Sequence, residues 1–223
     1  MSSRLFCAIA ALMLVALIVT PVQAGTTSVY TTDASFLAAA GGGLTFESFE
    51  TATLSSSAVV SFPGGTFSCS GTSYCPGFFG ISTDYADTGV QSVYFATPDT
   101  ATFTFSSPIM DFGIAIGGAG DIATITLVAS LSNGDSVNAL TNYNGTSGVF
   151  TTNRQYFGVI DSAPFTSVTF TGSDSGDGIF FDSMSYGNGS GSSTPEPASL
   201  LLLGIGLAGV GARKWSKSRS AAR

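Results

Sequence analysis

Apolar and polar residues alternate with a period of two along most of the chain, which is the pattern of strands with one buried face. Residues 101–105 place Phe103 and Phe105 on one face and two threonines on the other. Similar short segments recur at 111–116, 125–131, 136–140, 156–160, 167–171 and 178–186. Asn133-Gly134 between two of them is typical of a hairpin turn. A helical pattern is confined to residues 33–40, with Asp33 as the expected N-cap and glycines after it.

These segments predict an all-β fold, a two-sheet jelly-roll-like sandwich over residues 25–186. About ten to twelve short strands at spacings of roughly 8–15 residues suit such a sandwich. The body is long enough to bury a core, and most of the 18 phenylalanines are expected in it. No internal repeat is visible, which argues against a propeller or a solenoid.

The composition narrows the possible functions. Only 9% of the residues are charged, against 44% hydrophobic residues, which argues against a helical bundle with charged outer faces. Histidine is absent, which removes Ser-His-Asp and Cys-His catalysis and every histidine-containing zinc site. The formal charge of −7 argues against nucleic acid as a partner.

The N-terminal residues 1–24 have the organisation of a secretory signal peptide, expected to form a helix. Arg4 precedes an apolar run over residues 5–19, and small residues occupy the −3 and −1 positions of a cut between Ala24 and Gly25. The alternative is an N-terminal membrane anchor, for which the apolar run is short.

The C-terminal end has three parts in a fixed order. A Gly/Ser-rich linker at 187–194 leads to Pro195-Glu196-Pro197, then to an apolar run at 200–210, and then to a basic tail. This arrangement predicts a short transmembrane helix with its positive end inside. A permanent C-terminal anchor is the alternative to a removable signal.

Residues 195–219 resemble the PEP-CTERM sorting signal of Gram-negative bacteria in motif, order and spacing. The resemblance implies exosortase and the secretion machinery as partners, with cleavage near Pro195, Glu196 and Pro197. The protein would be held transiently in the inner membrane and then released to the cell surface or the extracellular matrix. The same tail is also known as an ice-binding protein C-terminal domain, a label that does not by itself imply ice binding.

The exported body is strongly acidic. All 14 carboxylates lie between residues 25 and 197, where Arg154 is the only cation. Such a surface repels anionic polymers and attracts divalent cations. The alternative is that the acidity serves solubility alone.

Two cysteines remain after the signal peptide, because Cys7 leaves with it. Cys69 and Cys75 are separated by five residues in an exported chain, which favours a disulfide that closes a small loop.

Two segments of the body resemble the strands that bracket jelly-roll cores in surface β-sandwiches. They are Phe46-Glu47-Ser48-Phe49-Glu50 and residues 178–186. The resemblance implies that these strands lie side by side and share a structural calcium through Glu47 and Asp182, although Ser183 stands where asparagine is common. The acidic segment 173–178 lacks the ligand positions of an EF-hand and is interpreted as a turn.

The preferred function is a non-catalytic module associated with carbohydrate or exopolysaccharide. Tyr85, and the group Asn142, Tyr143 and Asn144, are candidates for stacking and hydrogen bonding with sugars. The only tryptophan, Trp215, lies in the tail. A purely structural role in a matrix or biofilm is the alternative.

Two further functions are less favoured, and we expect no enzyme. A glycosidase needs a pair of carboxylates, for which Asp84 with Asp87, or Glu47 with Glu50, are available without any distinguishing feature. An ice-binding surface would need a regular array of threonines over many strands. The outward pairs Thr102 with Thr104 and Thr124 with Thr126 are attributed to β-propensity, and the array is expected to be missing.

Overall fold

The computed structural model describes residues 26–146, 148–173 and 176–189. The predicted signal peptide with its cut between Ala24 and Gly25, and the sorting signal with Pro195, Glu196 and Pro197, lie outside the described residues. Within those residues no helix is both long enough and apolar enough to cross a membrane.

The described residues form twelve strands and one helix. In chain order these are β1 (Thr27–Tyr30), α2 (Asp33–Ala40), β2 (Thr45–Glu47), β3 (Thr53–Ser56), β4 (Val59–Phe62), β5 (Gly65–Ser70), β6 (Phe79–Ser82), β7 (Ser92–Ala96), β8 (Thr100–Gly117), β9 (Ile125–Leu131), β10 (Ser136–Tyr143), β11 (Gln155–Gly172) and β12 (Gly178–Gly187).

The strands are arranged in two antiparallel layers that share their two longest members. One layer contains β1, β11, β8, β12, β7 and β6, with β2 beside β12. The other contains β10, β9, β11, β8, β5, β4 and β3. The first half of β8 pairs with β5 and its second half with β12, so β8 passes from one layer to the other. The all-β sandwich predicted from the sequence is confirmed.

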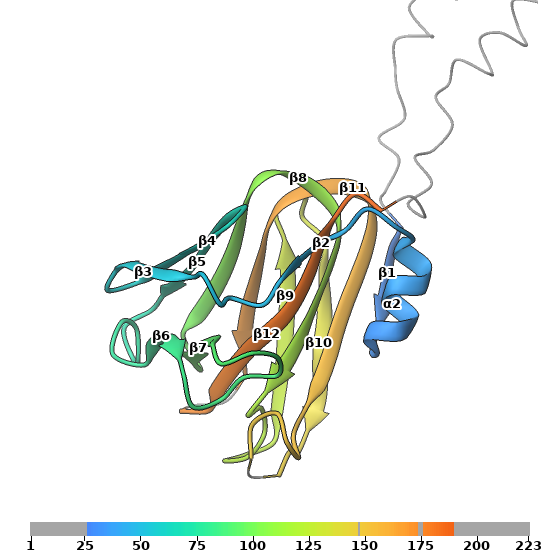
Figure 1. Ribbon diagram of the computed structural model, residues 1–223. Helices are drawn as coiled ribbons and strands as arrows, with labels where there is room; N and C mark the ends of the chain where they lie inside the picture. The colour runs from blue at the N-terminus through green and yellow to red at the C-terminus, as the bar shows by residue number, and fades with distance from the viewer. Residues whose placement is uncertain (1–25, 147, 174–175, 190–223) are drawn as a thin grey trace, which may run out of the picture.

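Strands β8 and β11 arch together over one end of the sandwich (Figure 1). Their register shifts between Ile160 and Ser167, where the paired strands bend. Segments 101–105 and 111–116, expected as two strands, are therefore halves of one strand. The exposed residues Ser106, Ser107 and Pro108 lie at the bend, and pairing with β11 resumes on both sides of it.

Phenylalanine rings from the two layers meet in the core. Phe170 of the second layer lies 4.8 Å from Phe181 of the first, measured between ring centroids. Phe103 likewise contacts Phe112 at 5.8 Å and Phe181 at 5.4 Å. All four side chains are fully buried, as the alternation in the sequence predicted for Phe103.

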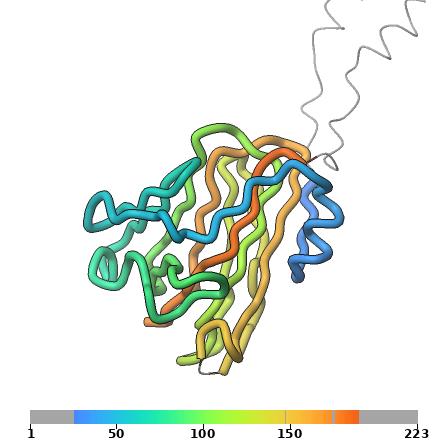
Figure 2. Tube along the Cα trace, in the orientation of Figure 1, coloured from blue at the N-terminus to red at the C-terminus, as the bar shows by residue number. Residues whose placement is uncertain are grey.

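The helix α2 packs on the outer face of the first layer, over β11 and β8 and beside β1 (Figure 2). Its N-cap is Thr32 rather than the expected Asp33, because Thr32 has extended backbone angles and its hydroxyl accepts a hydrogen bond from the Ser35 amide. Asp33 is the first helical residue. Phe36 is fully buried over Gly158 and Gly113, where a Cβ on either glycine would approach the Phe36 ring to 2.7 Å.

The outer face of the second layer carries aligned rows of small polar side chains. Strand register aligns Thr53, Ser61, Thr66, Thr104 and Ser167 in one row across β3, β4, β5, β8 and β11. A second row contains Ser68, Thr102, Thr169, Ser130 and Ser136 across β5, β8, β11, β9 and β10. Serines and threonines contribute equally to these two rows and come from strands far apart in the sequence, so the rows are not the regular array of threonines that an ice-binding surface would need.

Candidate functional site

Two aromatic residues stand side by side on the outer face of the first layer. Tyr94 of β7 and Phe180 of β12 are paired in register, and their rings stack at 5.5 Å with an interplanar angle of 28°. Their neighbours along the strands, among them Val93 and Phe181, are fully buried. Because side chains alternate across a sheet, burial of these neighbours directs Tyr94 and Phe180 outward.

Glycines flank this aromatic pair on both sides. Gly80 of β6 is opposite Tyr94, and Gly117 of β8 is opposite Phe180. A Cβ on Gly117 would lie 2.6 Å from the Val149 side chain, so that position has no room for a larger residue. In this row across four strands, only the two rings project from the sheet.

A third ring comes from the loop after β6. The Tyr85 ring packs edge-on against Phe180, with centroids 5.1 Å apart and an interplanar angle of 68°. The loop is held in place because the Asp182 carboxylate accepts hydrogen bonds from the Asp87 amide at 2.7 Å and the Thr88 amide at 2.9 Å. The Ser92 hydroxyl also donates to the Tyr85 carbonyl oxygen.

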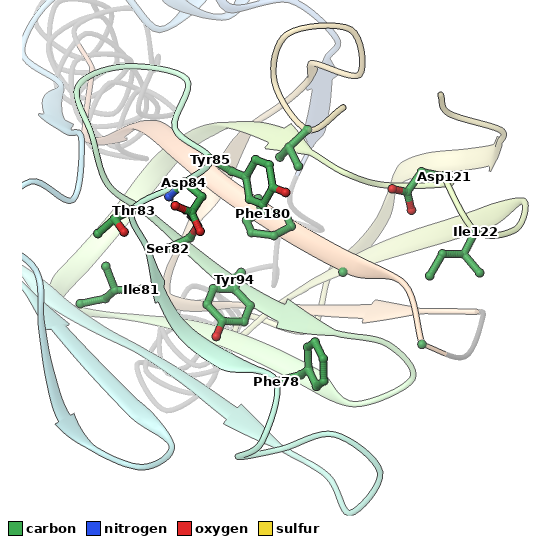
Figure 3. Close-up of a pocket in the computed structure, with 13 residues that line it drawn as sticks. Phe78, Ile81, Ser82, Thr83, Asp84, Tyr85, Tyr94, Asp121, Ile122 and Phe180 are labelled. Atoms are coloured by element: carbon green, nitrogen blue, oxygen red, sulfur yellow. Dashed lines mark hydrogen bonds between the residues drawn. The ribbon is translucent and has the colours of Figure 1, made fainter. Parts of the chain in front are cut away.

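These rings line a cleft of about 520 Å³, here called the aromatic cleft (Figure 3). Phe78 and Ile122 stand at its edges and are 61% and 65% exposed. The lining residues are Phe78, Ile81, Ser82, Thr83, Asp84, Tyr85, Tyr94, Asp121, Ile122, Val149, Gly176, Gly178 and Phe180. The cleft therefore combines exposed aromatic surface with hydroxyl and carboxylate groups.

The charge of the aromatic cleft is entirely negative. Asp84 and Asp121 lie on different sides of it, both exposed, and neither carboxylate accepts a hydrogen bond from another described residue (Figure 3). The only cation among the described residues, Arg154, lies elsewhere and is engaged by Asp87. Its Nε and Nη2 atoms lie 2.6 and 2.9 Å from the two carboxylate oxygens of Asp87.

The disulfide between Cys69 and Cys75 supports one edge of the cleft, with a Cα–Cα distance of 6.0 Å. The amides of Ser73, Tyr74 and Cys75 in this loop donate hydrogen bonds to the buried carboxylate of Asp99, which lies outside the loop in the sequence. The Tyr74 ring then packs edge-on against Phe78, at a centroid distance of 6.1 Å.

The two predicted metal ligands lie on adjacent strands, as the resemblance implied. Glu47 of β2 is paired with Met184 of β12, two residues beyond Asp182. Each carboxylate has its own backbone donors: Glu47 accepts from the Phe49 amide at 2.6 Å, and Asp182 accepts from three amides. Within the described ranges, no three acidic or cysteine side chains converge on a common point. Calcium binding by Glu47 and Asp182 stays a prediction.

Burial changes the ionisation of both carboxyls. It raises the pKa of Glu47, against the effect of the hydrogen bond from Phe49. It also raises the pKa of Asp182 to about 6, although the amides of Thr88, Ser183 and Asp87 favour the charged form. Ser183 itself has a left-handed backbone with φ of 50°, at a register shift in β12.

The structure separates several candidates that the sequence placed together. Asp84 faces the aromatic cleft, whereas Asp87 is paired with Arg154. Glu47 binds its own turn, whereas Glu50 accepts hydrogen bonds from the amides of Val90 and Gln91. The two carboxylates of each pair therefore have different surroundings in the structure.

Of the predicted sugar-stacking residues, Tyr85 lies in the aromatic cleft and the group at 142–144 does not. Tyr143 packs against the core, and its hydroxyl donates to Asn153 at 2.7 Å. Tyr94 and Phe180 were missed by the sequence reasoning. The alternation of apolar residues could have indicated them. Tyr94 lies at the outward position between Val93 and Phe95, and Phe180 lies at the outward position between Ile179 and Phe181.

The match to a known family model lies in the C-terminal segment. Residues 193–214 match the PEP-CTERM protein-sorting motif. No curated protein matches the chain.

Several solved structures align with this chain at low similarity. A mutant of a family 29 carbohydrate-binding module complexed with mannohexaose is 11% identical, with a TM-score of 0.39, over 70% of this chain and 100% of that one. TmCBM61 in complex with β-1,4-galactotriose is 15% identical, with a TM-score of 0.34, over 63% and 94% of the two chains. The CBM22-1 xylan-binding domain from Paenibacillus barcinonensis is 11% identical, with a TM-score of 0.36, over 66% and 94%. The fold assignment rests on the strand pairing described above.

Proposed function

We propose that this chain is an exported, surface-sorted β-sandwich that binds carbohydrate, without catalysis, in the aromatic cleft. The sorting motif at 193–214 supports export, with exosortase as the processing partner and the cell surface or extracellular matrix as the destination. The observation that carries the binding proposal is the group of three rings in one cleft, in which Tyr85 is exposed and Tyr94 and Phe180 are half-buried with their rings facing outward.

Aromatic rings and carboxylates are complementary to the two kinds of surface that a sugar presents. The C–H faces of a pyranose ring are apolar and pack on aromatic rings, which contribute largely through buried area. The hydroxyls of the same ring need acceptors, and the free carboxylates of Asp84 and Asp121 supply them. A cleft of about 520 Å³ falls in the usual range for ligand sites.

The electrostatics of the cleft select the class of glycan. Two carboxylates and no cation line it, so a polymer of uronic acids or sulfated sugars would be repelled. Arg154 offers no compensation, because both oxygens of Asp87 already engage it. The expected ligand is therefore a neutral glycan or one that carries amino groups.

The positions of the two carboxylates support binding without hydrolysis. A glycosidase acid is normally enclosed in an apolar pocket that keeps it protonated near neutral pH. Asp84 and Asp121 are both exposed to solvent, at different sides of the cleft.

A glycan array probed with the full-length protein tests this proposal. We expect retention on neutral or amine-bearing glycans and none on uronate polymers. Substitution Tyr94→Ala or Tyr85→Ala should weaken binding about tenfold, the equivalent of losing one aromatic contact of about 1.4 kcal/mol.

Leu54→Ala is the matched control, because Leu54 is an exposed apolar residue of β3 outside the cleft. It should bind like the unchanged protein. The proposal is wrong if no glycan is retained, which would favour a structural matrix role, or if both tyrosine variants bind with unchanged affinity.

A further inference from the structure

Most carboxylates of the protein are engaged by its own hydrogen-bond donors. Of the 14 carboxylates, Asp174 and Glu196 lie outside the described residues, which leaves twelve. Ten of these twelve accept a hydrogen bond from another described residue, in most cases from a backbone amide. The ten are Asp33, Glu47, Glu50, Asp87, Asp99, Asp111, Asp135, Asp161, Asp177 and Asp182.

The two other described carboxylates, Asp84 and Asp121, both line the aromatic cleft. No described residue donates a hydrogen bond to either side chain, and both side chains are exposed. In Figure 3 the rings of Tyr85 and Phe180 lie between the two carboxylates. A ligand seated on these rings is therefore flanked by two anionic groups that the described part of the protein leaves without donors.

The charge of the whole body acts in the same direction. Between residues 25 and 197 the 14 carboxylates are accompanied by a single cation, Arg154. Arg154 lies outside the aromatic cleft, where it is paired with Asp87 and Asp33. A field of one sign attracts ligands of the opposite charge and raises their local concentration. The body therefore favours the approach of a cationic ligand to the cleft.

An ammonium group on a sugar ring suits both parts of the cleft. A hydrogen bond between an ammonium and a carboxylate is stronger than one between neutral groups, because both partners are charged. It also compensates the carboxylate for the water that a bound ligand displaces. The faces of tyrosine and phenylalanine rings attract cations as well. A neutral sugar can stack on the same rings, but it lacks the pairing of opposite charges.

We propose that the aromatic cleft selects glycans whose sugar rings carry protonated amino groups, with Asp84 and Asp121 as the specificity-determining residues. This selectivity rests on carbohydrate binding in the same cleft, and it narrows the ligand to one class. Tyr94 and Phe180 pack against the faces of the sugar rings, while each carboxylate accepts hydrogen bonds from an ammonium group. The ligand class is a polymer of amino sugars.

Three β-1,4-linked hexasaccharides test this selectivity with the full-length protein. Hexamers of glucose, N-acetylglucosamine and glucosamine share one backbone and differ only at C2. At a pH that keeps the amines protonated, titration calorimetry should give the glucosamine hexamer an affinity about fivefold above the other two, as expected for two exposed ion pairs. This advantage should disappear at about 1 M salt, where the Debye length falls to about 3 Å.

The double variant with Asp84→Asn and Asp121→Asn should lose the preference for glucosamine and keep its affinity for the glucose hexamer, since asparagine still offers an acceptor oxygen. Asp33→Asn combined with Glu50→Gln is the matched control. Both residues are exposed outside the cleft, and the net charge changes by the same amount. This control should keep the preference, and melting curves verify that both double variants are folded.

The possible failures are distinguishable from one another. Equal affinities for the three hexamers, or a preference for an uncharged one, would overturn the selectivity and leave carbohydrate binding standing. A preference that persists without the carboxylates of Asp84 and Asp121, or that the control loses to the same extent, would overturn the assignment to these residues. Failure to bind any of the hexamers or any glycan of the array would contradict the proposed function, and the selectivity with it.

Discussion

At the scale of single residues, function depends on which side chains the sheet turns outward. Tyr94 and Phe180 lie between buried neighbours, and this alternation can be read from the sequence. Their pairing cannot be read in the same way, because β7 and β12 are far apart in the chain. Tyr85 was identified in advance because Asp84 and Asp87 surround it. The different destinations of those two carboxylates depend on Arg154, which lies 67 residues after Asp87.

The buried carboxyl of Asp182 makes the stability of the folded protein depend on pH. Burial raises its pKa from the ordinary 3.8 to about 6 in the folded protein. Between these values the folded state holds a proton that the unfolded chain releases. The stability from this proton is therefore complete below the unfolded pKa and is lost as the pH rises through about 6.

Urea denaturation at pH 4.5 and pH 7.5 measures this effect. We expect the unchanged protein to lose more stability over this rise in pH than Asp182→Asn, in which the group cannot titrate. Asp121→Asn, at an exposed carboxylate, should follow the unchanged protein. Equal pH dependence in Asp182→Asn and the unchanged protein would contradict the assignment.

At the scale of elements, the sequence predicted the strands better than their connections. The alternation in residues 125–131 and the turn at Asn133-Gly134 predicted β9 and the hairpin to β10. The sequence did not show that two predicted strands join to form β8, or that two others join to form β11. A bend within a strand and a turn between strands both contain exposed polar residues, so the pattern does not distinguish them. The alignment of serines and threonines on the second layer could not be predicted for a related reason, because such a row is defined by the register between distant strands.

The disulfide connects one such element to the aromatic cleft. Replacing both Cys69 and Cys75 by serine should lower the free energy of unfolding by about 2 kcal/mol, because the closed loop is short. Glycan affinity should also fall, since the loop supports Phe78 through Tyr74. Scanning calorimetry measures the stability and titration calorimetry measures the glycan affinity, each with and without reductant. Reductant should lower both quantities for the unchanged protein and leave the double variant unaffected. An equal response of the two proteins would contradict this role of the disulfide.

At the scale of the whole molecule, the sandwich presents two chemically different outer surfaces. The first layer carries the aromatic cleft, and the second carries aligned rows of serine and threonine side chains. The shared strands β8 and β11 connect the two layers into one body.

Sorting gives a prediction about the mass of the mature protein. Because residues 193–214 match the sorting motif, we expect the native surface protein to lack the basic tail that begins at Arg213. Intact-mass analysis of protein released from the cell surface determines this. A mass that includes residues 213–223 would support the permanent anchor instead.

The most direct test of carbohydrate binding is a nuclear magnetic resonance titration of aromatic side-chain signals. The titrant is the neutral or amine-bearing oligosaccharide best retained on the array. The signals of Tyr85, Tyr94 and Phe180 should shift together and saturate at one affinity, while Tyr143, which packs against the core outside the cleft, should stay unchanged. Unchanged signals for all three cleft rings, or shifts confined to residues elsewhere, would contradict the proposed function.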